Sequence, residues 1–247
     1  KRASLHNADQ IEKLDLYYGA SVAIEKGGEI IPKITSVDRN KRSIEAKKVL
    51  YASHCPDCQT ELIRIEGEAD HYCPNHEGCP TQIVGRIQHF ISRKAMNIYG
   101  LGSETIELLY QQRLIVSYAD LYALTYDQLI PLERMADKSV QNILDAIEES
   151  KKVPFERLLF ALGIRYVGQT VAKKLASHFG SIDALAKADV ETLVEVDEIG
   201  SRIAESVVDF FASLTNIQII DQLKMYGLQF ESKLAEHQPI SNILSGQ

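Results

Sequence analysis

The sequence predicts a multidomain α+β protein made of a partial β-barrel, a small metal-binding finger and an all-α domain. Short apolar strands joined by Gly27-Gly28 occupy the first fifty residues. All four cysteines lie between residues 55 and 79, in two closely spaced pairs. Beyond residue 82 the apolar residues follow a helical period, and a small turn motif recurs. These three observations divide the chain into its parts.

The first part, residues 1–50, predicts a β-barrel of the OB type. Asn7 has the form of a helix N-cap, and we expect strands at residues 21–26 and 30–37, with a third at 43–50. An OB-fold needs five strands, and about three can be counted here. We therefore expect the barrel to be incomplete at its N-terminal edge.

The cysteines form the most specific motif. Two residues separate Cys55 from Cys58, fourteen lie between Cys58 and Cys73, and Cys79 closes the second pair. Four thiolates fill the tetrahedral coordination of Zn²⁺, which makes the site structural and leaves no open position for chemistry. Two disulfides, a redox-active pair, or replacement of one sulfur by His76 are the alternatives.

The helical part contains a repeated turn. Its four copies end at residues 102, 136, 168 and 200, in steps of 34, 32 and 32 residues. In each copy a small residue ends the turn, and an apolar residue follows four positions later, which predicts four helix-turn-helix units. A small residue lets a phosphate approach the main chain at a helix N-terminus, where the N–H groups are unsatisfied. Tight helix connections without a ligand also use small turn residues.

The four copies differ in their surroundings. Ala136 ends the second copy in place of glycine, which costs steric freedom if φ is positive there. Asp197 and Glu198 flank the fourth copy, so we rank the first and third copies above the others as phosphate contacts. The predicted DNA contacts of this part are Gly100, Gly102, Lys138, Arg165, Gly168, Lys173 and Gly200.

Charge is distributed unevenly along the chain. The net charge is −7, yet residues 1–50 carry ten Lys/Arg against seven Asp/Glu, a net of +3, and the remainder carries −10. Any DNA-binding surface must therefore be local, and the acidic part must bind phosphate mainly through backbone groups. The sequence has no apolar run of eighteen residues and no signal-peptide pattern, so we expect a cytoplasmic protein with no membrane partner.

Five stretches together resemble one family, the bacterial NAD-dependent DNA ligases. They are SLHNAD (4–9), KGGEIIPK (26–33), HCPDC (54–58), GEA (67–69) and LGIRYVG (162–168). The resemblance covers nearly the whole chain and rests on the order of these motifs. It implies an OB-fold domain at residues 1–50, a four-cysteine zinc finger at 51–82, a helix-hairpin-helix domain at 83–231 and a linker at 232–247 towards a BRCT domain that this sequence lacks.

The resemblance also implies an activity. The family adenylates its own lysine from NAD⁺, passes AMP to the 5′-phosphate of a nick and forms the phosphodiester bond. That lysine lies in a Lys-x-Asp-Gly motif of another domain, and no such motif occurs here. We therefore expect a DNA-clamping, inactive piece of a monomeric ligase, with NAD⁺ and Mg²⁺ bound mainly outside it. Arg2, Lys26 and Lys33 are the expected contacts beside the nick.

A non-enzymatic DNA repair or junction-binding scaffold is the alternative function, because hairpin repeats alone do not fix activity. The first fifty residues separate the two hypotheses. A scaffold has no reason to carry the ligase-like motifs that they contain.

Overall fold

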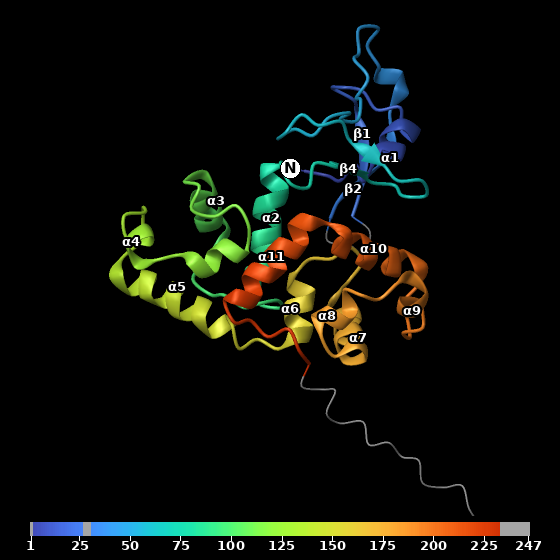
Figure 1. Ribbon diagram of the computed structural model, residues 1–247. Helices are drawn as coiled ribbons and strands as arrows, with labels where there is room; N and C mark the ends of the chain where they lie inside the picture. The colour runs from blue at the N-terminus through green and yellow to red at the C-terminus, as the bar shows by residue number, and fades with distance from the viewer. Residues whose placement is uncertain (1, 27–30, 233–247) are drawn as a thin grey trace, which may run out of the picture. The chain divides into compact units, whose positions relative to one another are not determined.

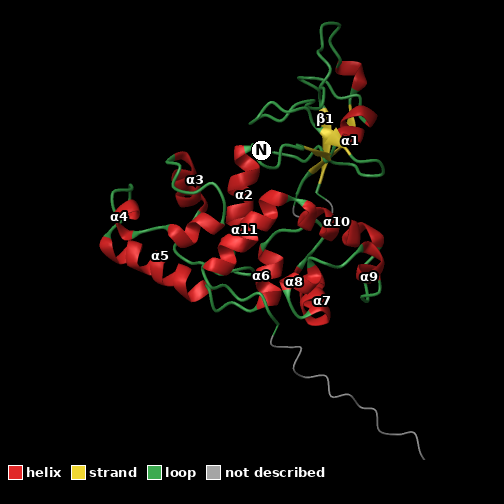
Figure 2. Cartoon of the chain, viewed as in Figure 1, coloured by secondary structure: helices red, strands yellow, loops and turns green. Residues whose placement is uncertain are grey.

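The computed structural model describes residues 2–26 and 31–232, and the chain divides into two compact units. The first unit is Lys1–Thr81 and the second is Gln82–Gln247 (Figure 1). Within the described residues, all strands belong to the first unit and the second is helical (Figure 2). The predicted α+β class is therefore confirmed.

The β-hairpin of the first unit consists of β1 (Val22–Glu25) and β2 (Lys33–Val37), which pair antiparallel. Glu25 lies opposite Lys33, so the pairing places opposite charges next to each other. The two predicted strands are confirmed, whereas the Gly27-Gly28 turn lies outside the described residues.

The predicted third strand at residues 43–50 is wrong. After the short helix η1 (Arg39–Lys41), the chain folds back on itself through a hydrogen bond from the Ala46 N–H to the Ser43 carbonyl (3.1 Å). It then makes one antiparallel bridge, between Tyr17 and Lys48. This turn occupies residues 43–46, so too few residues follow it to form a strand that pairs with the rest of the sheet.

The helix predicted after Asn7 is α1 (Ala8–Lys13). The Asn7 side chain accepts a hydrogen bond from the Gln10 N–H at 3.0 Å, which satisfies one exposed donor of the first turn. Ile11 is buried. The cap therefore fixes where this short helix begins.

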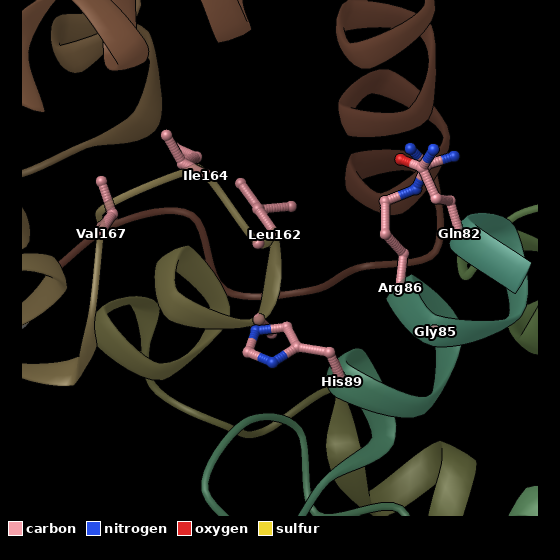
Figure 3. Close-up of a pocket in the computed structure, with 9 residues that line it drawn as sticks. Gln82, Gly85, Arg86, His89, Leu162, Ile164 and Val167 are labelled. Atoms are coloured by element: carbon pink, nitrogen blue, oxygen red, sulfur yellow. The ribbon is translucent and has the colours of Figure 1, made fainter. Parts of the chain in front are cut away.

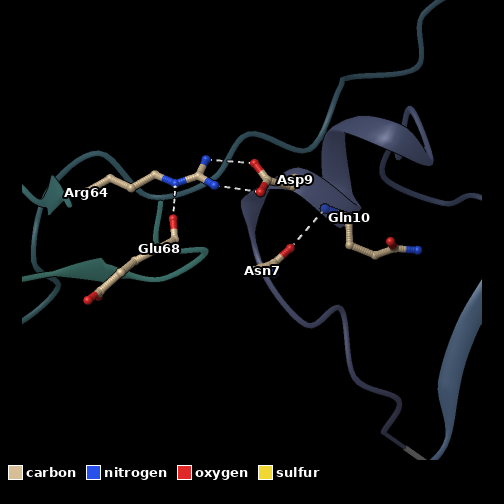
Figure 4. Close-up of polar contacts among 5 residues, drawn as sticks. All are labelled: Asn7, Asp9, Gln10, Arg64 and Glu68. Carbon is tan, nitrogen blue, oxygen red and sulfur yellow. Dashed lines mark hydrogen bonds and ion pairs between the residues drawn. The ribbon is translucent and has the colours of Figure 1, made fainter. Parts of the chain in front are cut away.

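The finger of the first unit contains a second hairpin, β3 (Ile63–Arg64) and β4 (His71–Tyr72). Arg64 donates two hydrogen bonds to the Asp9 carboxylate, at 2.7 and 2.6 Å, and its Nε donates to the Glu68 carbonyl at 2.7 Å (Figure 4). This fork-to-carboxylate geometry is the strongest form of ion pair. It ties the finger hairpin to α1 within this unit.

The second unit is built from helices of four to fourteen residues. They are α2 (Pro80–Ile91), which starts at the end of the first unit, α3 (Ser103–Gln111), η2 (Ala119–Ala123), α4 (Tyr126–Leu129), α5 (Asp137–Ser150), α6 (Phe155–Ala161), α7 (Gln169–Phe179), α8 (Ile182–Leu185), α9 (Val190–Val194), α10 (Ser201–Ala212) and α11 (Leu214–Met225). Successive helices pack in pairs, α6 with α7, α9 with α10 and α10 with α11, and α11 returns to contact η2.

One continuous apolar core holds these helices together. The apolar residues of α2 are buried, and Phe90 stacks on Tyr118 with ring centroids 4.5 Å apart. Ser150 is buried in this core, where its hydroxyl donates to the Ile147 carbonyl at 2.7 Å and lies 2.9 Å from the Tyr122 hydroxyl. The buried polar atoms are thus satisfied by one another.

The last two helices form a corner. The axes of α10 and α11 differ by 75°, and Ser213 caps α11 by accepting a hydrogen bond from the Asn216 N–H at 3.4 Å. Among the described helices, none alone is long and apolar enough to cross a membrane, and the bent pair α10–α11 reaches that length and composition only when joined. Of the predicted linker 232–247, the structure describes Ser232, whose N–H donates to the Gly180 carbonyl at 2.7 Å.

Candidate metal centre and nucleic-acid interface

The four cysteines converge on one point in the first unit. Their sulfur atoms all lie within 4.8 Å of one another. The Cys55 and Cys79 sulfurs are 3.9 Å apart, and those of Cys58 and Cys73 are 3.4 Å apart. A tetrahedral zinc ion bound at about 2.3 Å places its sulfur ligands about 3.8 Å from each other. The cluster therefore has the dimensions of a four-cysteine zinc site.

The surroundings of Cys58 favour its thiolate. Thr60 lies next to it, with the hydroxyl oxygen 3.2 Å from the Cys58 sulfur. Hydrogen bonds from the side chain and backbone of Thr60 lower the pKa of Cys58 to about 6, whereas burial raises the pKa of Cys73. Thiolates are the form that binds metal, and hydrogen bonds from neighbours orient them.

The alternatives for the cysteines lose support. None of the four is in a disulfide, and the clustered ligand atoms found among the described residues come from the four cysteines, without His76. A redox pair needs two cysteines, and here four meet. The zinc ligands predicted from the spacing are those that the structure brings together.

The four repeated turns of the second unit share one backbone conformation. We call them turn one (residues 100–102), turn two (134–136), turn three (166–168) and turn four (198–200). The first residue of each has a positive φ: Gly100 (89°), Arg134 (63°), Tyr166 (64°) and Glu198 (66°). Three of the four are not glycine, so the chain accepts a disfavoured conformation in order to build this turn.

The last residue of each turn is the N-cap of the following helix, in an extended conformation. These N-caps are Gly102, Ala136, Gly168 and Gly200. Each carbonyl accepts a hydrogen bond of 2.9–3.1 Å from the residue four positions on, respectively Ile106, Val140, Ala172 and Ala204. All four of these apolar residues are fully buried, as the repeat predicted. The pattern in the sequence is thus a pattern of helix starts.

These four helix starts have no side-chain cap, a feature that they share with α6, which begins after Pro154. At α3, α5, α7 and α10 the N-cap residue makes no side-chain hydrogen bond to the first-turn N–H groups. By contrast, side chains cap α1, α8, α9 and α11: Asn7, Ser181, Asp189 and Ser213. An uncapped N-terminus presents partial positive charge and donors that an anion can accept.

The positive φ that would make alanine costly at position 136 is not present. Ala136 has a φ of −114°, and the glycines at the same place in the other turns have φ between −88° and −78°. A Cβ added at Gly102, Gly168 or Gly200 would meet nothing within 4 Å. Glycine at these positions is therefore not demanded by the fold, and what it provides is space beside the helix N-terminus.

Charge separates the turns into two pairs. The first turn of α3 carries Glu104 and that of α5 carries Asp137, and both oppose an anion. The first turns of α7 and α10 carry no acidic residue. By this measure turns three and four oppose an anion least, whereas the sequence ranked turns one and three highest.

The acidic residues beside turn four share an ion pair with one lysine. Lys174 of α7 lies 3.0 Å from the Asp197 carboxylate and 3.0 Å from that of Glu198. Hydrogen bonds to Glu198 and Asp197 raise the pKa of Lys174. Sequence reasoning counted these acids against the fourth turn, because it could not see their partner on another helix.

Turns three and four are joined by an aromatic ring. The guanidinium carbons of Arg165 and Arg202 lie 4.9 and 4.6 Å from the centre of the Tyr166 ring. Arg165 precedes turn three, and Arg202 is in the first turn of α10, after turn four. The Ser206 hydroxyl also donates to the Arg165 carbonyl at 2.9 Å. Tyr166 was not among the residues predicted from sequence.

A pocket of about 370 Å³ adjoins turn three (Figure 3). One face of α2, with Arg86 and His89, forms one wall, and residues 161–164 with Val167 form the other. His89 Nε2 lies 2.9 Å from the Phe160 carbonyl oxygen, which can only accept, so Nε2 carries the proton. This contact holds α2 against the start of the third helix-turn-helix unit.

The other predicted DNA contacts are exposed. On the first unit these are Arg2, Lys26 and Lys33, and on the second unit they include Lys138 and Lys173. Lys33 lies in β2 opposite Glu25, whereas Lys26 follows the end of β1. Exposure is compatible with a DNA contact and equally with a solvated surface, so these five stay predictions.

Comparison with known families gives three matches along the chain. A model described as the NAD-dependent DNA ligase OB-fold domain matches residues 1–46. One described as the NAD-dependent DNA ligase C4 zinc finger domain matches residues 54–80, which contain all four cysteines. A helix-hairpin-helix motif matches residues 157–220, which contain turns three and four.

Curated DNA ligases are similar in sequence to this chain over its full length. The DNA ligase of Christiangramia forsetii is 60% identical over 246 residues, that of Flavobacterium psychrophilum 58% over 247 and that of Bacteroides fragilis 56% over 250. Each alignment covers 100% of this chain and 37% of the relative, so the chain spans just over a third of the length of these ligases. The chain belongs to the NAD-dependent DNA ligase family, of which it carries the OB-fold, the four-cysteine zinc finger and the helix-hairpin-helix region.

Proposed function

We propose that this chain is the part of an NAD-dependent DNA ligase that holds nicked duplex DNA. The observation that carries the proposal is the repeated turn, in which four helices start without a side-chain cap and three of them start at a glycine beside open space. Phosphate binding by backbone N–H groups explains how a chain with a net charge of −7 binds a polyanion. Turns three and four are the principal contacts, with Arg165 and Lys173 beside them.

The remaining contacts are weaker members of the same surface. Turn one contributes Gly100 and Gly102, and turn two contributes Lys138, each beside an acidic first turn. On the first unit Arg2, Lys26 and Lys33 contact the DNA beside the nick. Contacts with the phosphate backbone position the duplex and carry no sequence information, which suits an enzyme that must act at any nick.

In the whole enzyme the chemical steps take place on other parts. A lysine outside this chain takes AMP from NAD⁺, the AMP passes to the 5′-phosphate with Mg²⁺ present, and the 3′-hydroxyl displaces it. This chain keeps the two DNA ends in register for that displacement, and positioning of reactants contributes greatly to rate. We propose the domains 1–50, 51–82, 83–231 and 232–247 for these roles, in a monomer that acts in the cytoplasm, where a bacterial chromosome lies.

A titration of a labelled nicked duplex with the 247-residue chain tests the proposal, with the intact duplex of the same sequence as the comparison. We expect binding to both, because the contacts are to the phosphate backbone. Incubation with NAD⁺, Mg²⁺ and nicked DNA should give neither a protein adenylate nor a sealed product. Sealing would contradict the division of roles, and a lack of binding at low salt would contradict the proposal itself.

A further inference from the structure

Tyr166 holds a costly backbone conformation. Its φ of 64° lies in the left-handed region, where a bulky side chain is disfavoured. The equivalent residue of turn one is Gly100, at φ 89°, for which this region costs nothing. Glycine would serve turn three as well by geometry, and Tyr166 is the one aromatic residue among the four that hold this position. Strain of this kind concentrates at functional sites.

The ring lies within cation–π distance of two arginines that come from different turns. Arg165 and Arg202 place their guanidinium carbons 4.9 and 4.6 Å from its centre. Two like charges near one ring repel each other, and the attraction of each guanidinium to the ring offsets that repulsion. A guanidinium that stacks uses its face, whereas its N–H donors lie in its plane and suit the bidentate recognition of phosphate.

We propose that Tyr166 is a positioning residue that aligns Arg165 and Arg202 as a paired clamp for the phosphodiester backbone across turns three and four. The inference rests on the proposed function and adds to it the way in which two arginines are aligned. Main-chain N–H groups of the two helix starts supply one set of donors, and the two aligned arginines supply the second. Tyr166 acts through the arginines and needs no contact with DNA of its own.

Tyr166→Gly tests the proposal, because the variant keeps the favoured backbone and changes no charge. The affinity for nicked duplex and its salt dependence are measured on the 247-residue chain. We expect the affinity to fall about three- to tenfold and the slope of log K against log salt to become shallower by about one, as when one cationic phosphate contact is lost. A neutral substitution has no other reason to change that slope.

Tyr166→Phe is the conservative variant. It keeps the ring and should bind within about twofold of the unchanged chain, with the same slope.

Asn97→Gly is the matched control, since Asn97 is exposed, neutral and also at positive φ (55°). It should leave affinity and slope unchanged. Arg202→Lys is the second variant should Tyr166→Gly unfold: it keeps the charge, loses the planar stack and should weaken binding.

The proposal is overturned if Tyr166→Gly folds and keeps both affinity and slope, if Tyr166→Phe loses as much as Tyr166→Gly, or if Arg202→Lys binds like the unchanged chain. Gly168→Ala and Gly200→Ala distinguish this failure from that of the proposed function. When these two weaken DNA binding and Tyr166→Gly does not, the turns bind DNA without the clamp. When none of the variants matters, the proposed function falls too.

Discussion

Lys174 bridges two carboxylates, with its Nζ 3.0 Å from Asp197 Oδ2 and 3.0 Å from Glu198 Oε2. The lysine is on α7 and the acids are at turn four, so the contact joins the third and fourth helix-turn-helix units. Its single positive charge offsets one of the two negative charges beside the start of α10. The contact therefore reduces the opposition that the acidic sequence around turn four presents to a phosphate.

Lys174→Ala should weaken DNA binding about two- to fivefold, because it removes the positive charge that partly offsets two carboxylates near the phosphate. The triple variant with Asp197→Asn and Glu198→Gln removes those charges and should recover most of the affinity. Fluorescence anisotropy with a nicked duplex measures both. If the triple variant binds as weakly as Lys174→Ala, the lysine contacts DNA directly and its neutralising role is wrong.

Gly168→Ala should separate stability from binding. Gly168 has φ −78°, and a Cβ there meets nothing within 4 Å, so the free energy of unfolding should change by less than about 1 kcal/mol. The same Cβ occupies the space beside the first N–H groups of α7, and DNA affinity should fall about threefold or more.

Ala136→Gly is the matched reverse change at turn two. Its φ of −114° suits either residue, so stability should change little, whereas affinity should rise or stay the same. Unfolding curves and DNA titrations of both variants check these outcomes. Equal affinity of Gly168→Ala and the unchanged chain would mean that no phosphate approaches turn three.

Cys58→Ser should abolish stoichiometric zinc and unfold the finger, since the energy of a structural zinc site is folding energy. Thr60→Val keeps all four ligands and removes the hydroxyl 3.2 Å from the Cys58 sulfur. It should retain zinc but lose it to a chelator at about tenfold lower chelator concentration. Zinc content by emission spectroscopy and chelator competition measure the two. Unchanged metal content and thermal stability in Cys58→Ser would contradict the zinc site.

Asp9→Asn should destabilise the first unit in a pH-dependent manner. The hydrogen bonds from Arg64 lower the pKa of Asp9 below its ordinary 3.8. A lowered folded-state pKa stabilises the fold above the ordinary value, and this contribution is lost as the pH falls through the folded value. The difference in melting temperature between the two chains should therefore be constant near neutral pH and vanish in acid.

Glu12→Gln is the control for this pair, since Glu12 is an exposed carboxylate of the same helix. It should shift the melting temperature by less than Asp9→Asn at neutral pH. A difference between Asp9→Asn and the unchanged chain that persists well below pH 3.8 would contradict the ion pair as its cause.

Local patterns in the sequence predicted much of the fold. The spacing from Cys55 to Cys79 predicted the metal cluster, because short cysteine pairs hold their ligands locally. The apolar residues four positions after each turn, such as Val140 and Ala204, predicted where the helices start. Such a pattern is informative because the helical backbone fixes its period. The first β-hairpin followed from its two apolar runs.

Three features could not be predicted from residue type and local pattern. The positive φ at Arg134 and Glu198 leaves no signal in residue type, since neither is glycine. The pairing of Lys174 with Asp197 joins positions 23 apart in sequence. Residues 43–50 look like a strand by composition, and the hydrogen bond from Ala46 to Ser43 turns them instead. In each case a tertiary or turn contact decides against the local preference.

The central claim is that oriented main-chain groups bind the DNA backbone, and one comparison tests it most directly. The slope of log K against log salt for the nicked duplex gives the number of phosphates neutralised by side-chain cations, at about 0.9 per phosphate. Ethylation interference on the same complex counts all the phosphates contacted. We predict more contacted phosphates than the slope accounts for. No binding at low salt, or a slope that accounts for every contacted phosphate, would contradict it.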